Sequence, residues 1–157
     1  MLSKQELLKQ KIDENVEYLN SSTIKLDALF VCTKDGFIVR SLIKKNHDIK
    51  AERVAAIISS LLGISDAAGK EIANEKSKNI ILEFESNILV VMNFVFQAEE
   101  FIIAALSNRK NNLGQAIFLT RSFTKELAAV WAWASGVAQI VMRIKSDRSA
   151  RENRYFM

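Results

Sequence analysis

The sequence predicts an α+β domain built on a five-stranded antiparallel sheet. Segments of alternating or continuous apolar character fall into a group of two and a group of three, with hairpin-length links inside each group. Three further segments, placed before, between and after these groups, carry apolar residues at helical spacing. The predicted order is therefore α-β-β-α-β-β-β-α, with sequential strands lying side by side.

The chain begins with a short amphipathic helix, predicted over residues 1–20. Its apolar residues recur at helical spacing with charged residues between them: Leu7, Leu8, Ile12, Val16 and Leu19. The strands predicted next are Leu26–Cys32 and Phe37–Ile43. Between them Lys34-Asp35-Gly36 predicts a tight turn, because Asp-Gly is a strong hairpin signal.

The second strand group follows the central helix. Residues Lys78–Glu85 alternate between apolar and polar, which is typical of a half-buried strand. A two-residue turn at Ser86-Asn87 leads into Ile88–Phe96, whose nearly continuous apolar character predicts burial on both faces. A polar turn at 97–100 then precedes the fifth strand, Phe101–Ser107.

A long helix is predicted from Leu113 to about Ser146, capped by Asn111 or Asn112. Its packing seam has apolar residues at spacings of four and three: Phe123, Leu127, Val130, Ala134, Val137, Val141 and Ile144. Trp131 and Trp133 cannot both point into this seam, so at least one lies in an interface or is partly exposed; the alternative is that both cap the core. We therefore divide the chain into a helix at 1–20, a domain at 24–146 and a basic tail at 147–157.

The central helix is predicted over Ile49–Ala73, with Asp48 as its N-cap. One apolar stripe is expected to face the sheet: Val54, Ile57, Ile58, Leu61, Ile64, Ala68 and Ile72. A second small or apolar set lies beside it: Ala51, Ala55, Leu62, Ser65 and Gly69. Because polar residues are scarce between Arg53 and Asp66, we predict that the helix is covered on two sides, the second by another copy of itself. The alternative is a central helix buried within one subunit.

Length and composition fit one globular domain and exclude several classes of protein. The chain has 157 residues, 49% hydrophobic and 25% charged, which is close to globular averages. The net charge is +4, and the basic residues are interspersed with acidic ones over most of the chain. A nucleic-acid binder usually has its basic residues clustered. The single cysteine excludes an intramolecular disulfide framework, and the first residues lack the apolar run of a signal peptide, so a cytoplasmic location is expected.

The sequence offers little chemistry. Cys32 and His47 form the only conceivable cysteine–histidine pair, and a buried small residue beside a solvated loop histidine is the commoner explanation. No metal-ligand spacing, P-loop or dinucleotide-binding glycine pattern occurs, so no cofactor is expected. The apolar stretch Leu127–Met142 is shorter than the roughly 20 residues of a membrane span. We predict a non-catalytic protein without a transmembrane segment.

Taken together, the elements resemble the roadblock/light-chain-7 superfamily. The likeness is carried by 28–31 (Ala-Leu-Phe-Val) before 34–39 (Lys-Asp-Gly-Phe-Ile-Val), then by the Ala/Ile/Leu-rich helix 54–68 and the hairpin 80–94. Finally, 104–106 (Ala-Ala-Leu) leads through 112–114 (Asn-Leu-Gly) into the closing helix. The resemblance covers roughly residues 26–127 and implies a roadblock/longin-like sheet with helices on both faces.

The resemblance further implies a dimer, with an identical chain or a paralogue. In this family the strand after the central helix pairs with its mate across a two-fold axis, and the two central helices pack side by side. The residues this places in the interface are Ala51, Ala55, Ile58, Leu62, Ser65, Asn79, Ile80, Ile81, Leu82 and Glu83.

Family members are non-catalytic platforms, and bacterial and archaeal ones often regulate Ras-like GTPases. We therefore expect a GTPase partner, held through its switch loops or met by an inserted arginine; the arginines available are Arg40, Arg53, Arg109 and Arg121. Residues bordering the paired helices are candidates for partner binding: Lys44, Lys45, Lys50 and Arg53. The alternative is a structural adaptor of a motor, secretion or cytoskeletal complex without a GTPase. The basic tail is a candidate contact for an acidic partner or lipid, or a solvated helix end.

Overall fold

The computed structural model describes residues 1–21, 25–44 and 47–134. Within them lie three helices and five strands in the predicted order. Their bounds are α1 Lys4–Ser21, β1 Leu26–Thr33, β2 Ile38–Ile43, α2 Ala51–Ala73, β3 Asn79–Glu83, β4 Asn87–Phe96, β5 Glu99–Asn108 and α3 Leu113–Ala134. The fold class predicted from sequence is confirmed.

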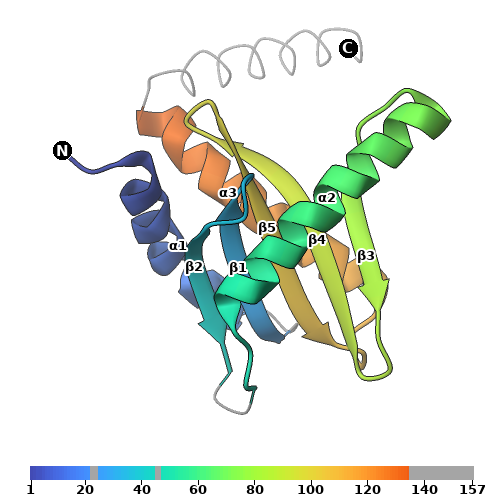
Figure 1. The fold of residues 1–157 in the computed structure, drawn as a ribbon. Helices are drawn as coiled ribbons and strands as arrows, with labels where there is room; N and C mark the ends of the chain where they lie inside the picture. The colour runs from blue at the N-terminus through green and yellow to red at the C-terminus, as the bar shows by residue number, and fades with distance from the viewer. Residues whose placement is uncertain (22–24, 45–46, 135–157) are drawn as a thin grey trace, which may run out of the picture.

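The five strands form one antiparallel sheet in the order β2-β1-β5-β4-β3. The first hairpin therefore pairs with the last strand, and β3 stands at one edge. Figure 1 shows three layers, with α2 running diagonally across one face of the sheet and with α1 and α3 on the other. This arrangement leaves β2 and β3 as the two edges of the sheet.

The larger apolar cluster fills the layer between the sheet and the helices α1 and α3. Leu8 and Ile12 of α1 and Phe123 and Leu127 of α3 are fully buried there against β4 and β5. The N-terminal helix therefore contributes to the core of the domain. The predicted seam of the last helix is confirmed at Phe123 and Leu127. The later seam positions lie outside the described side chains, and so do Trp131, Trp133 and the basic tail.

The turn predicted at Lys34-Asp35-Gly36 is confirmed, whereas the turn predicted at Ser86-Asn87 lies one residue earlier, because Asn87 already belongs to β4. Gly36 adopts a φ of +86° in the β1–β2 turn, a conformation that glycine enters without steric cost. Gln97 and Ala98 both have positive φ, so the β4–β5 hairpin turns over these two residues and β5 begins earlier than predicted. β4 is buried as expected, except at Val95, which is 56% exposed.

The predicted N-terminal cap of α3 is confirmed, and the predicted cap of α2 is wrong. At the start of α3, Asn112 Oδ1 accepts a hydrogen bond from the Gln115 amide at 2.7 Å, and Gln115 Oε1 accepts one from the Asn112 amide at 3.2 Å. This reciprocal pair is a capping box. The predicted Asp48 cap is wrong, because α2 begins at Ala51, and Lys50 occupies the cap position without a side-chain hydrogen bond.

Candidate protein-interaction surface

The inner face of α2 packs against its own sheet through small and branched side chains. Ala55, Ile58 and Leu62 are 0–3% exposed. They join Phe30 of β1 and Ile102 of β5 in the second apolar cluster. These helix residues were predicted to lie in a dimer interface, and the structure places them in the core of the subunit.

The outer face of α2 carries large apolar residues. Ile57, Ile64 and Ile72 are 58%, 67% and 85% exposed. The prediction that they face the sheet is wrong, and Ala68 of the same stripe is exposed as well. Only Ile58 of that stripe is fully buried, while Val54 and Leu61 are partly buried. The predicted sheet-facing stripe is thus only partly buried, and the set beside it supplies Ala55 and Leu62 to the core.

Near its start, α2 also lies close to the β1–β2 turn. A Cβ atom added at Gly36 would lie 3.3 Å from the Ala55 carbonyl oxygen and 3.2 Å from Ser59 Cβ. Ser59 Oγ also donates a hydrogen bond of 2.6 Å to the Lys34 carbonyl. The small Ser59 side chain allows this close contact.

β3 supplies an apolar edge beside the helix layer. Within the described residues it pairs only with β4. Ile80 packs with the α2 side of the sheet and Ile81 with the α3 side, and both remain partly exposed. Phe84, immediately after the strand, is 49% exposed. β3 contains no lysine, proline or bulge that would deter strand pairing, although it is short and ends in the charged Glu83.

The predicted interface residues therefore divide into two groups. The strand group lies on the free edge, where Asn79, Ile80, Ile81 and Leu82 are partly buried and Glu83 is exposed. Of the helix group, Ala51 and Ser65 are partly buried and the other three fill the core. The α2 surface open to a partner is instead the face of Ile57, Ile64 and Ile72, which sequence periodicity had assigned to the sheet.

The predicted basic residues are not equivalent. Lys44 Nζ lies 3.0 Å from Asp27 Oδ1, which places it at the end of β2 in an ion pair. Lys50 and Arg53 are exposed at the start of α2. Lys45 lies outside the described residues. Two of the four side chains are thus shown at the helix surface.

A family model described as the Roadblock/LC7 domain matches residues 14–107. The chain belongs to the Roadblock/LC7 domain family. The match spans α1 from its middle through β5 and includes both components of the surface, α2 and β3. No curated protein sequence matches the chain.

Solved structures of similar fold agree with this Roadblock/LC7 assignment. Myxococcus xanthus MglB superposes with a TM-score of 0.64 at 13% identity, covering 83% of this chain and 91% of that one. A structure described as MglB with tetrameric arrangement gives 0.64 at 12% identity, with 85% and 94% covered. A Roadblock/LC7 domain from Streptomyces avermitilis gives 0.51 at 16% identity, with 81% and 93% covered. At these identities the likeness establishes the fold.

The described part of this Roadblock/LC7 chain gives little support for catalysis. Cys32 is fully buried, and desolvation raises the pKa of its thiol to about 11, so the thiolate that would act as a nucleophile is strongly disfavoured. His47 is exposed. Over the described ranges, no group of three metal-ligating side chains gathers, and no helix is long and apolar enough to cross a membrane.

Proposed function

We propose that the protein is a homodimeric, non-catalytic platform that binds and regulates a small Ras-like GTPase. The observation that carries the first half of this proposal is the exposed apolar face of α2 next to the apolar edge strand β3. Such a combination is characteristic of a surface that another chain covers. Among the similar structures, one MglB is described in a tetrameric arrangement, which is compatible with self-association of this fold.

The sequence of β3 suits antiparallel pairing with a second copy of itself. With a two-fold axis at Ile81, Asn79 stands opposite Glu83 of the second copy, and Ile80 opposite Leu82. This register pairs apolar side chains with one another and gives the Glu83 carboxylate an amide neighbour, with no like charges opposed. Ile80 lies on the α2 side of the sheet, so the same pairing brings the two α2 helices toward each other.

The dimer is tested by Ile64→Glu. Since Ile64 is 67% exposed, a glutamate there leaves the subunit core intact but introduces a buried charge into the proposed interface. We expect sedimentation velocity to show a dimer for the wild type and a folded monomer for the variant. Phe118→Glu is the matched control, because Phe118 is 68% exposed on α3 and should leave the dimer unchanged.

A monomeric wild type at micromolar concentration would refute the dimer. So would an Ile64→Glu variant that stays dimeric, or a Phe118→Glu variant that dissociates while Ile64→Glu does not. Far-UV circular dichroism of each variant separates loss of assembly from loss of folding.

The GTPase half of the proposal rests on membership of the Roadblock/LC7 family, whose bacterial and archaeal members often regulate Ras-like GTPases. The described residues offer a surface for binding, and regulation would follow from preferential affinity for one arrangement of the switch loops. Lys50 and Arg53, exposed at the start of α2, would steer an acidic patch of the partner toward this surface.

Binding is tested with the small GTPases of the same cell, loaded with GTP or GDP. We expect one nucleotide state to be retained on the immobilised protein, and the double variant Lys50→Glu, Arg53→Glu to reduce retention. Lys125→Glu, an exposed charge on α3, is the control and should retain the GTPase. A dimer that retains neither nucleotide state would overturn the GTPase proposal and favour an adaptor instead.

A further inference from the structure

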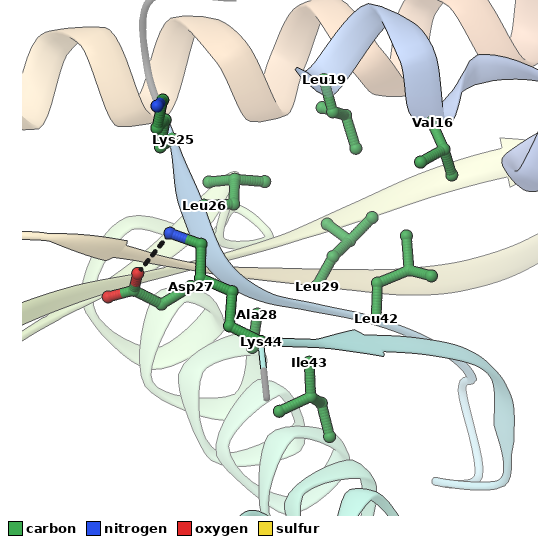
Figure 2. A pocket seen from close by; sticks show the side chains of 10 residues that line it. All are labelled: Val16, Leu19, Lys25, Leu26, Asp27, Ala28, Leu29, Leu42, Ile43 and Lys44. Carbon is green, nitrogen blue, oxygen red and sulfur yellow. Dashed lines mark hydrogen bonds and ion pairs between the residues drawn. The ribbon is translucent and has the colours of Figure 1, made fainter. Parts of the chain in front are cut away.

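An apolar pocket lies beside the last turns of α1 at the adjoining ends of β1 and β2, and Ala28 and Ile43 of the α2 side of the sheet line it as well. Its volume is about 470 Å³, within the range of roughly 300–1,000 Å³ that is usual for small-ligand sites. Figure 2 shows Val16 and Leu19 of α1 facing Leu26, Leu29 and Leu42 of the sheet across this space.

Among the described residues that line the pocket, the charged ones are Lys25, Asp27 and Lys44. Asp27 Oδ1 is 3.0 Å from Lys44 Nζ, and Asp27 Oδ2 accepts a hydrogen bond of 2.9 Å from Asn87 Nδ2, so this carboxylate already has two partners. Lys25 is exposed, and among the described residues no carboxylate lies within ion-pair distance of it. Two ammonium groups against one satisfied carboxylate leave the rim positive, which favours an anionic group there.

The interior of the pocket suits hydrocarbon better than water. A buried water usually needs two to four polar partners, and the facing side chains of α1, β1 and β2 are aliphatic. A ligand that fits both parts has an apolar chain ending in a single anion. A cationic ligand does not match the charge of the rim.

We propose that this pocket binds a medium-chain fatty acid. Its alkyl chain would lie among Leu19, Leu29 and Leu42, and its carboxylate would be held by Lys25 and Lys44. Lysine offers a point charge without the paired donors of an arginine fork, which is sufficient for one carboxylate at an open rim. The proposal does not depend on the dimer or on a GTPase partner.

The test is calorimetric titration of the full-length protein with sodium decanoate, below the concentration at which it forms micelles. We expect saturable binding of one molecule per chain. Val16→Trp fills the pocket and should abolish binding, whereas Gln10→Trp, which places the same indole on the exposed side of α1, should retain it. Lys25→Gln should weaken decanoate about two- to fivefold, as expected for an exposed charge pair, and Lys125→Gln should not.

Decanol and decyl phosphate separate the parts of the proposal. Decanol should bind more weakly than decanoate, and its binding should not change with Lys25→Gln. Tighter binding of decyl phosphate than of decanoate would overturn the carboxylate as the proposed head group and favour a phosphate. Should Val16→Trp fail to fold, magnetisation transfer between decanoate and leucine methyl groups of the wild type locates the ligand directly. Non-saturable heat, contacts to methyl groups elsewhere, or binding that survives in a folded Val16→Trp variant would overturn the site.

Discussion

Gly36 and Gly63 stand in opposite situations on the α2 side of the sheet. Gly36 has a φ of +86°, and a Cβ there would meet Ser59 Cβ, the Ala55 carbonyl and Ala56 Cα at 3.2–3.3 Å. Gly63 lies in the exposed part of α2, and nothing falls within 4 Å of an added Cβ. The first glycine is required by the backbone and its neighbours, while the second only weakens the helix.

The two glycines therefore predict stability changes of opposite sign. Gly36→Ala should lower the free energy of unfolding by about 1–3 kcal/mol, through the left-handed backbone and the close contacts to α2. Gly63→Ala should raise it by up to about 1 kcal/mol, because alanine is the better helix former. Urea unfolding followed by circular dichroism measures both. Equal effects of the two changes would show that the turn does not pack on α2 as described.

At the scale of elements, α2 shows which features apolar periodicity can predict and which it cannot. Helical spacing located the helix and its apolar character correctly, within two residues at its start. It could not select the face turned to the sheet, because two neighbouring arcs are both apolar and small residues occur in each. The buried arc packs on residues far apart in sequence, among them Phe30 of β1 and Ile102 of β5, and local periodicity does not carry that information.

β3 was easier to place. Its alternation and its two flanking turns gave the strand within a few residues, and its edge position followed from the family resemblance. Nothing in residues 78–85 alone tells an edge strand from an inner one. Likewise, the pocket beside α1 joins Val16 to Leu42 across three elements, and no local pattern indicates such a space.

The capping box at the start of α3 gives a prediction at this scale. Asn112→Ala removes the acceptor for the Gln115 amide and should lower the free energy of unfolding by about 1 kcal/mol. Asn111→Ala is the control, since its side chain makes only a 3.4 Å hydrogen bond to the Lys25 carbonyl. Urea midpoints compare the two variants. A larger loss at Asn111 would mean that the link between α3 and β1, and not the cap, supports the helix start.

At the scale of the whole molecule, the order of elements predicted the sheet, and the short links predicted its antiparallel pairing. Composition could not predict that β5 lies at the centre, between β1 and β4, since this requires the last strand to pair with the first hairpin. The result is a three-layer subunit with two apolar clusters, one on each side of the sheet. Only the α2 side leaves several large apolar helix residues exposed among the described residues.

The proposed homodimer makes thermal stability depend on concentration. Because association stabilises the folded state by mass action, a roughly hundredfold higher protein concentration should raise the melting temperature of the wild type. Differential scanning fluorimetry or calorimetry across that range measures the shift. Ile64→Glu should remove this dependence on concentration, while the core of the subunit stays intact because Ile64 is exposed. A wild-type melting temperature that stays constant would contradict obligatory assembly.

The β3 edge also matters before assembly of the proposed homodimer is complete. A newly made subunit carries a hydrogen-bonding strand with isoleucines at 80 and 81 and no lysine or proline to deter other strands. Until a second copy arrives, any exposed strand of an unfinished chain can compete for that edge. The rate of synthesis and the local supply of identical chains thus decide whether the edge is closed by a proper mate or becomes the start of an aggregate.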